Sequence, residues 1–267
     1  MKIYQVDSFT KELFKGNPAA VAIVENELST DLMQQIALEM NLSETAFITL
    51  HDNHCDLRWF TPASEVPLCG HATLASAFAL WKKGYWDTSK VIEFRTLSGS
   101  LFTSLDENGM ITMDFPSNPA KPNLGFDKAE MELVFGYPIK EVLDYPDELI
   151  LIFEHEEAVL NANPNSEIIA AQAKSGVIVS ARGEQSGYDF VSRYFAPNLG
   201  IKEDPVTGFM HTILTPYWAS ETGKTEFNAF QASARTGEMQ TVLKGDRVLL
   251  KGHAIMVFET ELSLPSK

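Results

Sequence analysis

A chain of 267 residues and 29.7 kDa, with 45% hydrophobic and 21% charged residues, has the size of two domains or one large one and the composition of an ordinary globular protein. Fibrous and disordered classes are therefore excluded. The 21 Lys and Arg residues against 36 Asp and Glu residues give a formal net charge of −15, and because a field of this sign repels phosphate backbones and anionic lipid surfaces, nucleic-acid and membrane partners are not expected.

Most of the sequence predicts short strands, because runs rich in β-branched and aromatic residues alternate with turn signals. The predicted strands are Ala19–Val24, Asp56–Phe60, Val91–Arg95, Ser100–Leu105, Met110–Phe115, Gly176–Ser180, Gly187–Phe195, Glu238–Lys244 and Arg247–Lys251. Asn108-Gly109 and Gly245-Asp246 lie between consecutive strands and predict hairpins with type I′ turns. The sheets are therefore expected to be largely antiparallel.

A few segments between these strands predict helices instead. In Ser29–Asn41 apolar residues recur at helical spacing on one face, with Ser29 or Thr30 as the N-cap, which is typical of an amphipathic surface helix. Gly70–Trp81 and Gly208–Trp218 are apolar nearly all round, which indicates helices enclosed by other structure. Pro216 is expected to bend or shorten the second of them.

The two apolar helices are preceded by related sequences. Arg58–Pro62 (Arg-Trp-Phe-Thr-Pro) precedes the first helix and Arg193–Pro197 (Arg-Tyr-Phe-Ala-Pro) precedes the second, each followed by a loop and a glycine. We interpret the chain as two pseudo-repeated α+β domains, each a mostly antiparallel sheet or barrel wrapped around a central helix. The predicted domains are residues 1–118 and 119–267, divided in the Pro- and Asn-rich stretch Pro116–Gly125, and the last strand could return to the first domain.

Several residues near the two apolar helices could take part in chemistry. The helix N-termini at Gly70 and Gly208 could bind an anion through free N–H groups, although both glycines could simply permit tight turns. Glu44 lies among small and apolar residues between a helix and a strand, where a desolvated carboxylate suits proton transfer, although a surface or capping glutamate is the simpler interpretation. Asp204 could accept a hydrogen bond from a substrate or cap its own turn.

The histidines and cysteines add less. His71 and His211 each lie in the first turn of an apolar helix, where a lone histidine is more often a core residue than a catalyst. Cys69 directly precedes the first of these helices, and we expect its thiol pKa to be lowered there. His51 and His54 stand beside Cys55 in a polar turn, which is weak support for a metal site.

The compartment follows from the cysteines and from the absence of targeting signals. Two cysteines without CxxC spacing are too few for a disulfide framework and indicate a reducing interior. The N-terminal segment lacks the apolar core of a signal peptide, and no run reaches the roughly 18 apolar residues of a membrane span. We therefore expect a cytoplasmic protein.

Taken together, the motifs resemble a known family. The residues that carry the resemblance are Gly16–Ala20, Asn41–Phe47 (Asn-Leu-Ser-Glu-Thr-Ala-Phe), Arg58–Pro62 with Glu65-Val66, Leu68–Leu74 (Leu-Cys-Gly-His-Ala-Thr-Leu), Glu203–Gly208 (Glu-Asp-Pro-Val-Thr-Gly), His211, Pro216–Trp218, Gln231–Arg235 and Gly245–Val248. They resemble the PhzF family of phenazine-biosynthesis-like isomerases. The match runs the whole chain, so it is specific jointly even though no single motif is.

This resemblance implies a fold, a reaction and a site. The fold is the diaminopimelate-epimerase-like one, with the active site between two similar domains and with relatives that form homodimers. The reaction moves a proton between carbons of a cyclic dihydroanthranilate, with Glu44 as the acid/base and without a metal or organic cofactor. The substrate-binding residues that the resemblance implies are His71, Asp204, Gly70, Thr207, Gly208 and Phe209.

At Phe209 the sequence departs from the family pattern, which has serine. The bulky ring either closes the pocket to a dihydroanthranilate or stacks on a flatter or smaller substrate. Because Glu44, His71 and Asp204 are retained, the leading hypothesis is a cofactor-free isomerase that moves a proton on a small carboxylate-bearing substrate. Two alternatives stay open: an amino-acid epimerase or racemase, for which Cys69 lacks a second cysteine, and a non-catalytic ligand-binding relative altered at Phe209.

Overall fold

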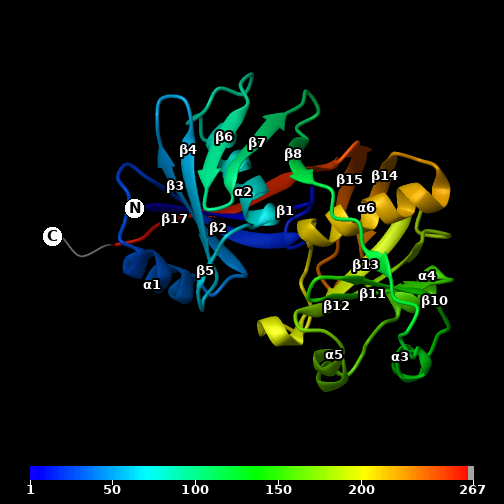
Figure 1. Cartoon of the computed structure of the whole chain (residues 1–267). Helices are drawn as coiled ribbons and strands as arrows, with labels where there is room; N and C mark the ends of the chain where they lie inside the picture. The colour runs from blue at the N-terminus through cyan, green and yellow to red at the C-terminus, as the bar shows by residue number, and fades with distance from the viewer. Residues whose placement is uncertain (264–267) are drawn as a thin grey trace. The chain divides into compact units, whose positions relative to one another are not determined.

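The computed structural model describes residues 1–263 and divides the chain into two compact units (Figure 1). Unit 1 is Met1–Asp114 together with the C-terminal segment that begins at Lys251, and unit 2 is Phe115–Leu250. The contact pattern thus changes at Asp114, where the sequence suggested a boundary at residue 118. Each helix in residues 1–263 is too short or too polar to cross a membrane.

Unit 1 combines a mixed sheet with two helices. Its elements are β1 (Lys2–Ser8), β2 (Asn17–Val24), α1 (Thr30–Met40), β3 (Glu44–Leu50), β4 (Cys55–Phe60), β5 (Glu65–Val66), α2 (Gly70–Lys82), β6 (Ile92–Thr96), β7 (Gly99–Leu105), most of β8 (Ile111–Pro116) and β17 (Ala254–Glu261). Figure 1 shows α2 among these strands, and it contacts β1, β2, β3 and β17. Its side chains are buried on nearly every face, as the apolar sequence predicts.

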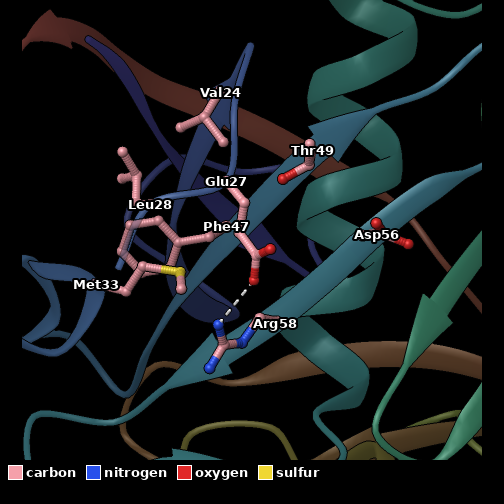
Figure 2. A pocket seen from close by; sticks show the side chains of 8 residues that line it. All are labelled: Val24, Glu27, Leu28, Met33, Phe47, Thr49, Asp56 and Arg58. Carbon is pink, nitrogen blue, oxygen red and sulfur yellow. Dashed lines mark hydrogen bonds and ion pairs between the residues drawn. The ribbon is translucent and has the colours of Figure 1, made fainter. Parts of the chain in front are cut away.

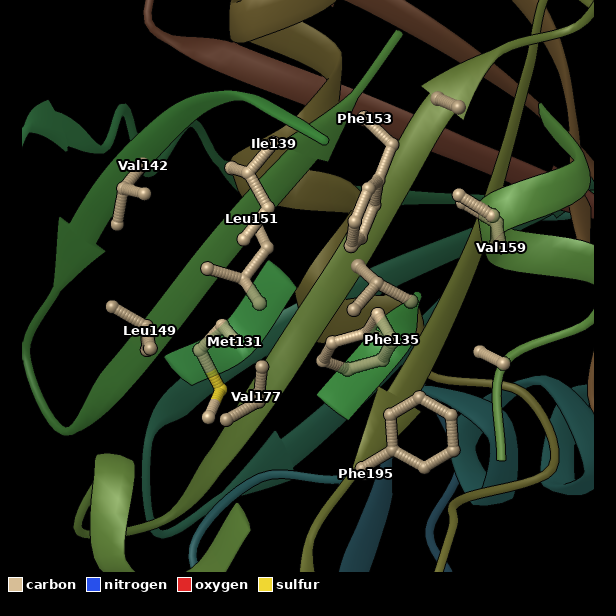
Figure 3. Close-up of a cluster of buried hydrophobic side chains, with 14 of the residues drawn as sticks. Met131, Phe135, Ile139, Val142, Leu149, Leu151, Phe153, Val159, Val177 and Phe195 are labelled. Carbon is tan, nitrogen blue, oxygen red and sulfur yellow. The ribbon is translucent and has the colours of Figure 1, made fainter. Parts of the chain in front are cut away.

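Unit 2 has a similar set of elements. They are β9 (Lys121–Pro122), α3 (Ala129–Phe135), β10 (Ile139–Tyr145), β11 (Glu148–Phe153), α4 (Glu156–Leu160), α5 (Ser166–Gln172), β12 (Gly176–Arg182), β13 (Phe190–Phe195), the short 3₁₀ helix η1 (Pro197–Leu199), α6 (Gly208–Thr222), β14 (Glu226–Gln231), β15 (Gly237–Lys244) and β16 (Arg247–Gly252). One of its hydrophobic cores packs α3 against the strands: Figure 3 shows Met131 and Phe135 beside Leu151, Phe153 and Val177. Burial of such side chains is the main force that holds this layer together.

The two units repeat one strand order, which confirms the predicted pseudo-repeat. In unit 1, β1–β2 is antiparallel, β2–β3 parallel, β3–β4 antiparallel, β4–β6 parallel and β6–β7 antiparallel. In unit 2, the pairs β10–β11, β11–β12, β12–β13, β13–β14 and β14–β15 follow the same alternation. Antiparallel pairs therefore dominate, with two parallel pairs in each series.

The related sequences before the central helices form the same local structure. Arg58 makes two parallel hydrogen bonds of 2.8 Å to Glu65, and its guanidinium lies over the Phe60 ring. In unit 2, Arg193 does the same with Glu203, at 2.7 and 2.9 Å, and with the Phe195 ring. Paired N–H···O bonds of this kind fix geometry as well as charge, so each one anchors the loop that leads to a central helix.

The predicted surface helix is confirmed, with caps at both ends. The Ser29 side chain accepts a hydrogen bond from the Leu32 N–H, so Ser29 rather than Thr30 is the N-cap of α1. Asn41 ends the helix in the left-handed conformation, with φ of 49°. In unit 2, the predicted strand from Gly187 starts later, at Phe190, because Gly187 has φ of 82° and cannot continue a strand.

Both predicted hairpins form, but the predicted type I′ turns are wrong. A type I′ turn needs positive φ at both central residues, yet only Gly109 of the first pair and only Gly245 of the second have it. In the first hairpin the Asp106 carboxylate accepts from the N–H groups of Asn108 and Met110, which favours a longer loop that ends in a left-handed glycine. In the second, a single positive φ at the first central residue is typical of a type II′ turn.

The expectation that Pro216 bends or shortens its helix is wrong as regards length, because α6 continues to Thr222. A proline in a helix interior leaves the carbonyl four residues earlier without its usual donor, here that of Thr212. The backbone N–H of Asn118 donates to this carbonyl at 3.1 Å, and the Asn118 side chain donates to Thr212 Oγ1 at 2.8 Å. A segment distant in sequence therefore replaces the hydrogen bond that Pro216 removes.

Candidate active site

Glu44 is the first residue of β3, directly after the turn that ends α1. It pairs with Ala19 of β2 in parallel register, and its neighbours Thr45 and Ala46 are fully buried. Its carboxylate Oε2 lies 3.1 Å from His71 Nε2, while the side chain as a whole is 18% exposed. The strand thus places a carboxylate with one oxygen fixed by a histidine and with part of its surface accessible.

His71 links Glu44 to a thiol. Cys69 is the N-cap of α2 and His71 is its second residue, and both are buried. Cys69 Sγ lies 3.5 Å from His71 Nδ1, on the opposite ring nitrogen from Glu44. The backbone carbonyl of His71 accepts a hydrogen bond of 2.7 Å from the Ser8 hydroxyl. The result is a continuous row, Cys69–His71–Glu44, within unit 1.

The charges in this row differ from the expectation for the thiol. Burial, reinforced by the Glu44 carboxylate, raises the pKa of Cys69, so the predicted lowering at a helix N-terminus is wrong. Burial alone would lower the pKa of His71, but Cys69 and Glu44 together raise it well above its ordinary value. The Cys69 thiol and the His71 ring thus shift each other, and the acid–base properties of the row belong to the cluster rather than to one residue.

The N-termini of the two central helices lack side-chain caps. Neither Cys69 before α2 nor Thr207 before α6 makes a side-chain capping bond, whereas Ser29 and Asn165 cap α1 and α5. Uncapped first-turn N–H groups are the donors that bind carboxylates and phosphates at helix ends. The geometry therefore leaves room for the anion-binding role predicted at Gly70 and Gly208.

In unit 2, the predicted residues Asp204 and Thr207 belong to one hydrogen-bonded network. The Thr207 hydroxyl donates to the Asp204 carboxylate at 2.5 Å. The fully buried Gln231 accepts from the Thr207 N–H at 2.7 Å and donates to the Asp204 carbonyl at 2.9 Å. Gln231 was not among the predicted site residues, although it lies in a motif that carries the resemblance. A buried amide that tethers a loop leaves no periodic signal in the sequence.

The remaining two residues of this helix end have different surroundings. Phe209 is 38% exposed and its ring meets the Tyr145 ring edge-on, with 5.7 Å between centroids. His211 is fully buried, its Nδ1 lies 2.8 Å from the Thr207 carbonyl, and burial lowers its pKa to about 4. His211 is thus a neutral core residue, as the simpler interpretation predicted.

The structure also has a cavity that the candidate site does not use. Its volume is about 20 Å³, and Figure 2 shows Phe47, Leu28, Met33 and Arg58 among the side chains that line it. That is space for roughly one water molecule. None of Glu44, Cys69 and His71 lines it, so it is a packing defect of unit 1 and not a substrate pocket.

Comparisons with known proteins agree with the motifs. A family model described as phenazine biosynthesis-like protein matches residues 6–260. An uncharacterized isomerase of Pseudomonas aeruginosa is 42% identical over 99% of both chains. A crystal structure of a phenazine biosynthesis protein of Enterococcus faecalis superposes with a TM-score of 0.91 at 39% identity, covering 98% of this chain and 99% of the other. A probable proline racemase of Agrobacterium radiobacter, 10% identical with a TM-score of 0.63 over 99% of this chain and 93% of its own, shares the fold.

Proposed function

Because the chain belongs to the PhzC-PhzF family of phenazine biosynthesis-like proteins, an isomerase family, we propose that it is a cofactor-free isomerase in which Glu44 moves a proton on a small carboxylate-bearing substrate. One observation carries this proposal: the Glu44 carboxylate is held at 3.1 Å by His71, yet its side chain is 18% exposed. A general base must be fixed in orientation and still reach the proton that it removes.

The proposed step needs no co-reactant. Glu44 takes a proton from an acidic C–H bond of the substrate, and the electron pair is delocalised into the adjacent unsaturated group. The protonated carboxyl group then returns a proton at another carbon or face, and in D₂O exchange of this carboxyl proton with solvent would place deuterium in the product. The contact with His71 Nε2 keeps the Glu44 carboxylate oriented before the transfer. The Cys69 thiol contacts the other ring nitrogen of His71, Nδ1, and so helps to fix the orientation of the ring.

A carboxylate on the substrate would have donors close to this base. Glu44 pairs with His71 in the first turn of α2, and this turn has no side-chain cap. Its free N–H groups, including that of Gly70, could therefore hold a substrate carboxylate. We propose that Asp204, Thr207, Gly208 and Phe209 also contribute to substrate binding, since the first two already form one polar network.

The two-thiol mechanism of an amino-acid epimerase is disfavoured by one feature. The N-cap of α6, which corresponds to Cys69 of α2, is Thr207. The Thr207 hydroxyl donates a hydrogen bond to Asp204, and a hydroxyl cannot replace the second thiol of that mechanism.

Glu44→Gln tests the assignment. A panel of cyclic carboxylates (a dihydro-3-hydroxyanthranilate, proline and trans-4-hydroxyproline) is first screened by thermal shift, because a ligand that binds the folded state raises Tm. Any hit is then incubated in D₂O, and deuterium incorporation is followed by NMR. We expect the wild type to incorporate deuterium and Glu44→Gln to lose at least about 10³-fold in rate, while the thermal shift persists.

Glu148→Gln is the matched control, since it makes the same change at a buried carboxylate in the equivalent strand pair of unit 2. This control should exchange at the wild-type rate. Full exchange by Glu44→Gln would overturn the role of Glu44. Binding of a panel member without exchange by the wild type would instead favour a non-catalytic binding protein.

A further inference from the structure

The turn between β3 and β4 brings together two histidines and an aspartate outside the candidate active site. Leu50 pairs with Cys55 and the His51 N–H donates to the His54 carbonyl at 3.0 Å, so the turn is short and closed. One ligand atom each from His51, His54 and Asp56 lies within 4.8 Å of the other two. We propose that these three side chains bind one divalent cation of the zinc type.

The distances fit such an ion. In a tetrahedral site with bonds of about 2.0–2.1 Å, neighbouring ligand atoms are roughly 3.3–3.4 Å apart. His51 Nε2 lies 2.8 Å from one oxygen of Asp56, and His54 Nε2 lies 3.7 Å from the other. The two rings are stacked with centroids 4.4 Å apart and planes 11° from parallel. The two distances to Asp56 therefore bracket the spacing of a tetrahedral site, and rotation of the exposed His51 side chain about its χ angles would turn the stacked rings toward one ion.

The hydrogen bonding of His54 supplies an independent reason. Its Nδ1 lies 2.8 Å from Asn53 Oδ1, and the ring nitrogen is the donor in this contact because an amide oxygen only accepts. The other ring nitrogen, Nε2, faces the Asp56 carboxylate at 3.7 Å. A cation between Nε2 and this carboxylate would bind both. A partner on the second nitrogen, such as Asn53, is what metal-bound histidines ordinarily have.

The donor set also selects the ion. Two imidazoles with one carboxylate suit Zn²⁺, Ni²⁺ or Cu²⁺, whereas Mg²⁺ and Ca²⁺ prefer oxygen ligands alone. The side chains of His51, His54 and Asp56 are 40%, 14% and 50% exposed, so an ion can reach them from solvent. Three protein ligands leave a fourth position for water or another donor.

Two other clusters in the described part of the chain are weaker. In Glu44, Cys69 and His71, both ring nitrogens already face a partner, on opposite sides of the imidazole, and the thiol keeps its proton because burial raises its pKa. The cluster of His155, Glu157 and Glu184 offers one imidazole and two carboxylates. The turn between β3 and β4 is the one cluster among residues 1–263 that offers two imidazoles on a closed loop.

The test is a titration of the untagged, chelator-treated full chain with ZnCl₂ alone, in which isothermal titration calorimetry measures the stoichiometry and the affinity. We expect one ion per chain. Asp56→Asn should weaken binding at least about tenfold, and the double variant His51→Gln/His54→Gln at least about a hundredfold, since bound metals depend on every ligand. His155→Gln is the matched control and should bind as the wild type does. Equal Tm values of all variants in EDTA would show that folding is unaffected.

Substitution of Co²⁺ distinguishes this site from the one that contains a thiol. Cobalt bound by nitrogen and oxygen shows only weak d–d bands, whereas ligation by Cys69 adds intense sulfur-to-metal charge transfer. The proposal is overturned if the double variant binds Zn²⁺ as tightly as the wild type, if His155→Gln weakens binding equally, or if the cobalt spectrum shows thiolate ligation.

Discussion

Each unit has a glutamate in the equivalent pair of parallel strands, but the glutamate lies on the second strand of the pair in unit 1 and on the first strand in unit 2. In unit 1, Ala19 of β2 pairs with Glu44 of β3, and in the equivalent pair of unit 2, Glu148 of β11 pairs with Gly176 of β12. The register confirms the equivalence. In unit 1, the residue three positions after Glu44 pairs with Arg58, and in unit 2, the residue three positions after Gly176 pairs with Arg193. One scaffold thus carries a carboxylate in two different environments.

Packing explains why the acid cannot occupy the second strand in unit 2. A Cβ at Gly176 would lie 2.6 Å from the Phe195 carbonyl and 2.7 Å from the Tyr194 ring, closer than atoms can approach. The Tyr194 hydroxyl reaches instead to Glu148, at 2.9 Å, and that side chain is buried. Unit 2 therefore encloses its acid, whereas unit 1 leaves Glu44 partly accessible beside a histidine.

The N-termini of the central helices α2 and α6 also differ in the polarity of their side chains. At the start of α2 stand Cys69 and His71, which form a polar row with Glu44. The equivalent positions at the start of α6 are Thr207 and Phe209, a hydroxyl used within its own loop and an aromatic ring. At these two equivalent positions the ionisable side chains lie in unit 1 alone, so equivalent substitutions are expected to have unequal effects.

The largest expected effect concerns the paired arginines. Arg193→Ala should lower the free energy of unfolding by about 4 kcal/mol, because it leaves Glu203 without its partner in a nearly buried site and the Ala162 carbonyl without its donor. Arg58→Ala should cost only about 2 kcal/mol, since its site is more exposed. Urea unfolding, with hydrogen exchange read separately in each unit, measures the difference. Equal losses would show that the two anchors are energetically alike.

The repeat itself was readable because it depends on local sequence. The runs beginning at Arg58 and Arg193 keep the same residue types, and both central helices are apolar on all faces, so neither needed long-range information. The predicted short strands were found for the same reason, although β1, β10, β11, β14 and β17 were not among them. The turn types were not, because Asp106 and its side-chain hydrogen bonds decide the first of them, and dipeptide preferences do not include that contact.

The parts of the site that the sequence did not predict depend on contacts between distant segments. The raised pKa of Cys69 follows from its burial and from Glu44, whereas the sequence showed only a helix N-terminus. Gln231 joins the loop of Asp204 from a strand that follows the helix. The length of α6 depends on Asn118, almost a hundred residues before Pro216. Helix and strand periodicity cannot report any of these contacts.

A middle-sized effect tests the enclosed acid. Burial raises the pKa of Glu148 to about 7, so the folded state keeps this proton up to about pH 7, whereas the unfolded chain releases it near about pH 4.3. Its contribution to stability is therefore complete below about pH 4.3 and is lost as the pH rises to about 7. Glu148→Gln should stabilise the protein by about 2 kcal/mol at pH 8 and change little at pH 4.5.

Thermal unfolding across this pH range measures that prediction. Glu226→Gln, at the exposed start of β14 in the same unit, is the control and should not alter the pH dependence. A pH profile unchanged by Glu148→Gln would mean that the buried carboxyl is ionised in the folded protein, and the contrast between the enclosed and the accessible acid would then fail.

The smallest effect is expected at Phe209, the counterpart of His71. Its ring is 38% exposed and contacts Tyr145 in one edge-on pair, so Phe209→Ser should cost only about 1 kcal/mol. A double-mutant cycle with Tyr145→Ala should assign most of this loss to the ring pair, because residues in contact are not additive. If the cycle shows no coupling, the contact between the Phe209 and Tyr145 rings contributes nothing to the stability of unit 2. If Phe209→Ser by itself also costs nothing, the ring has no structural role, and the divergence of the two helix ends would be functional rather than structural.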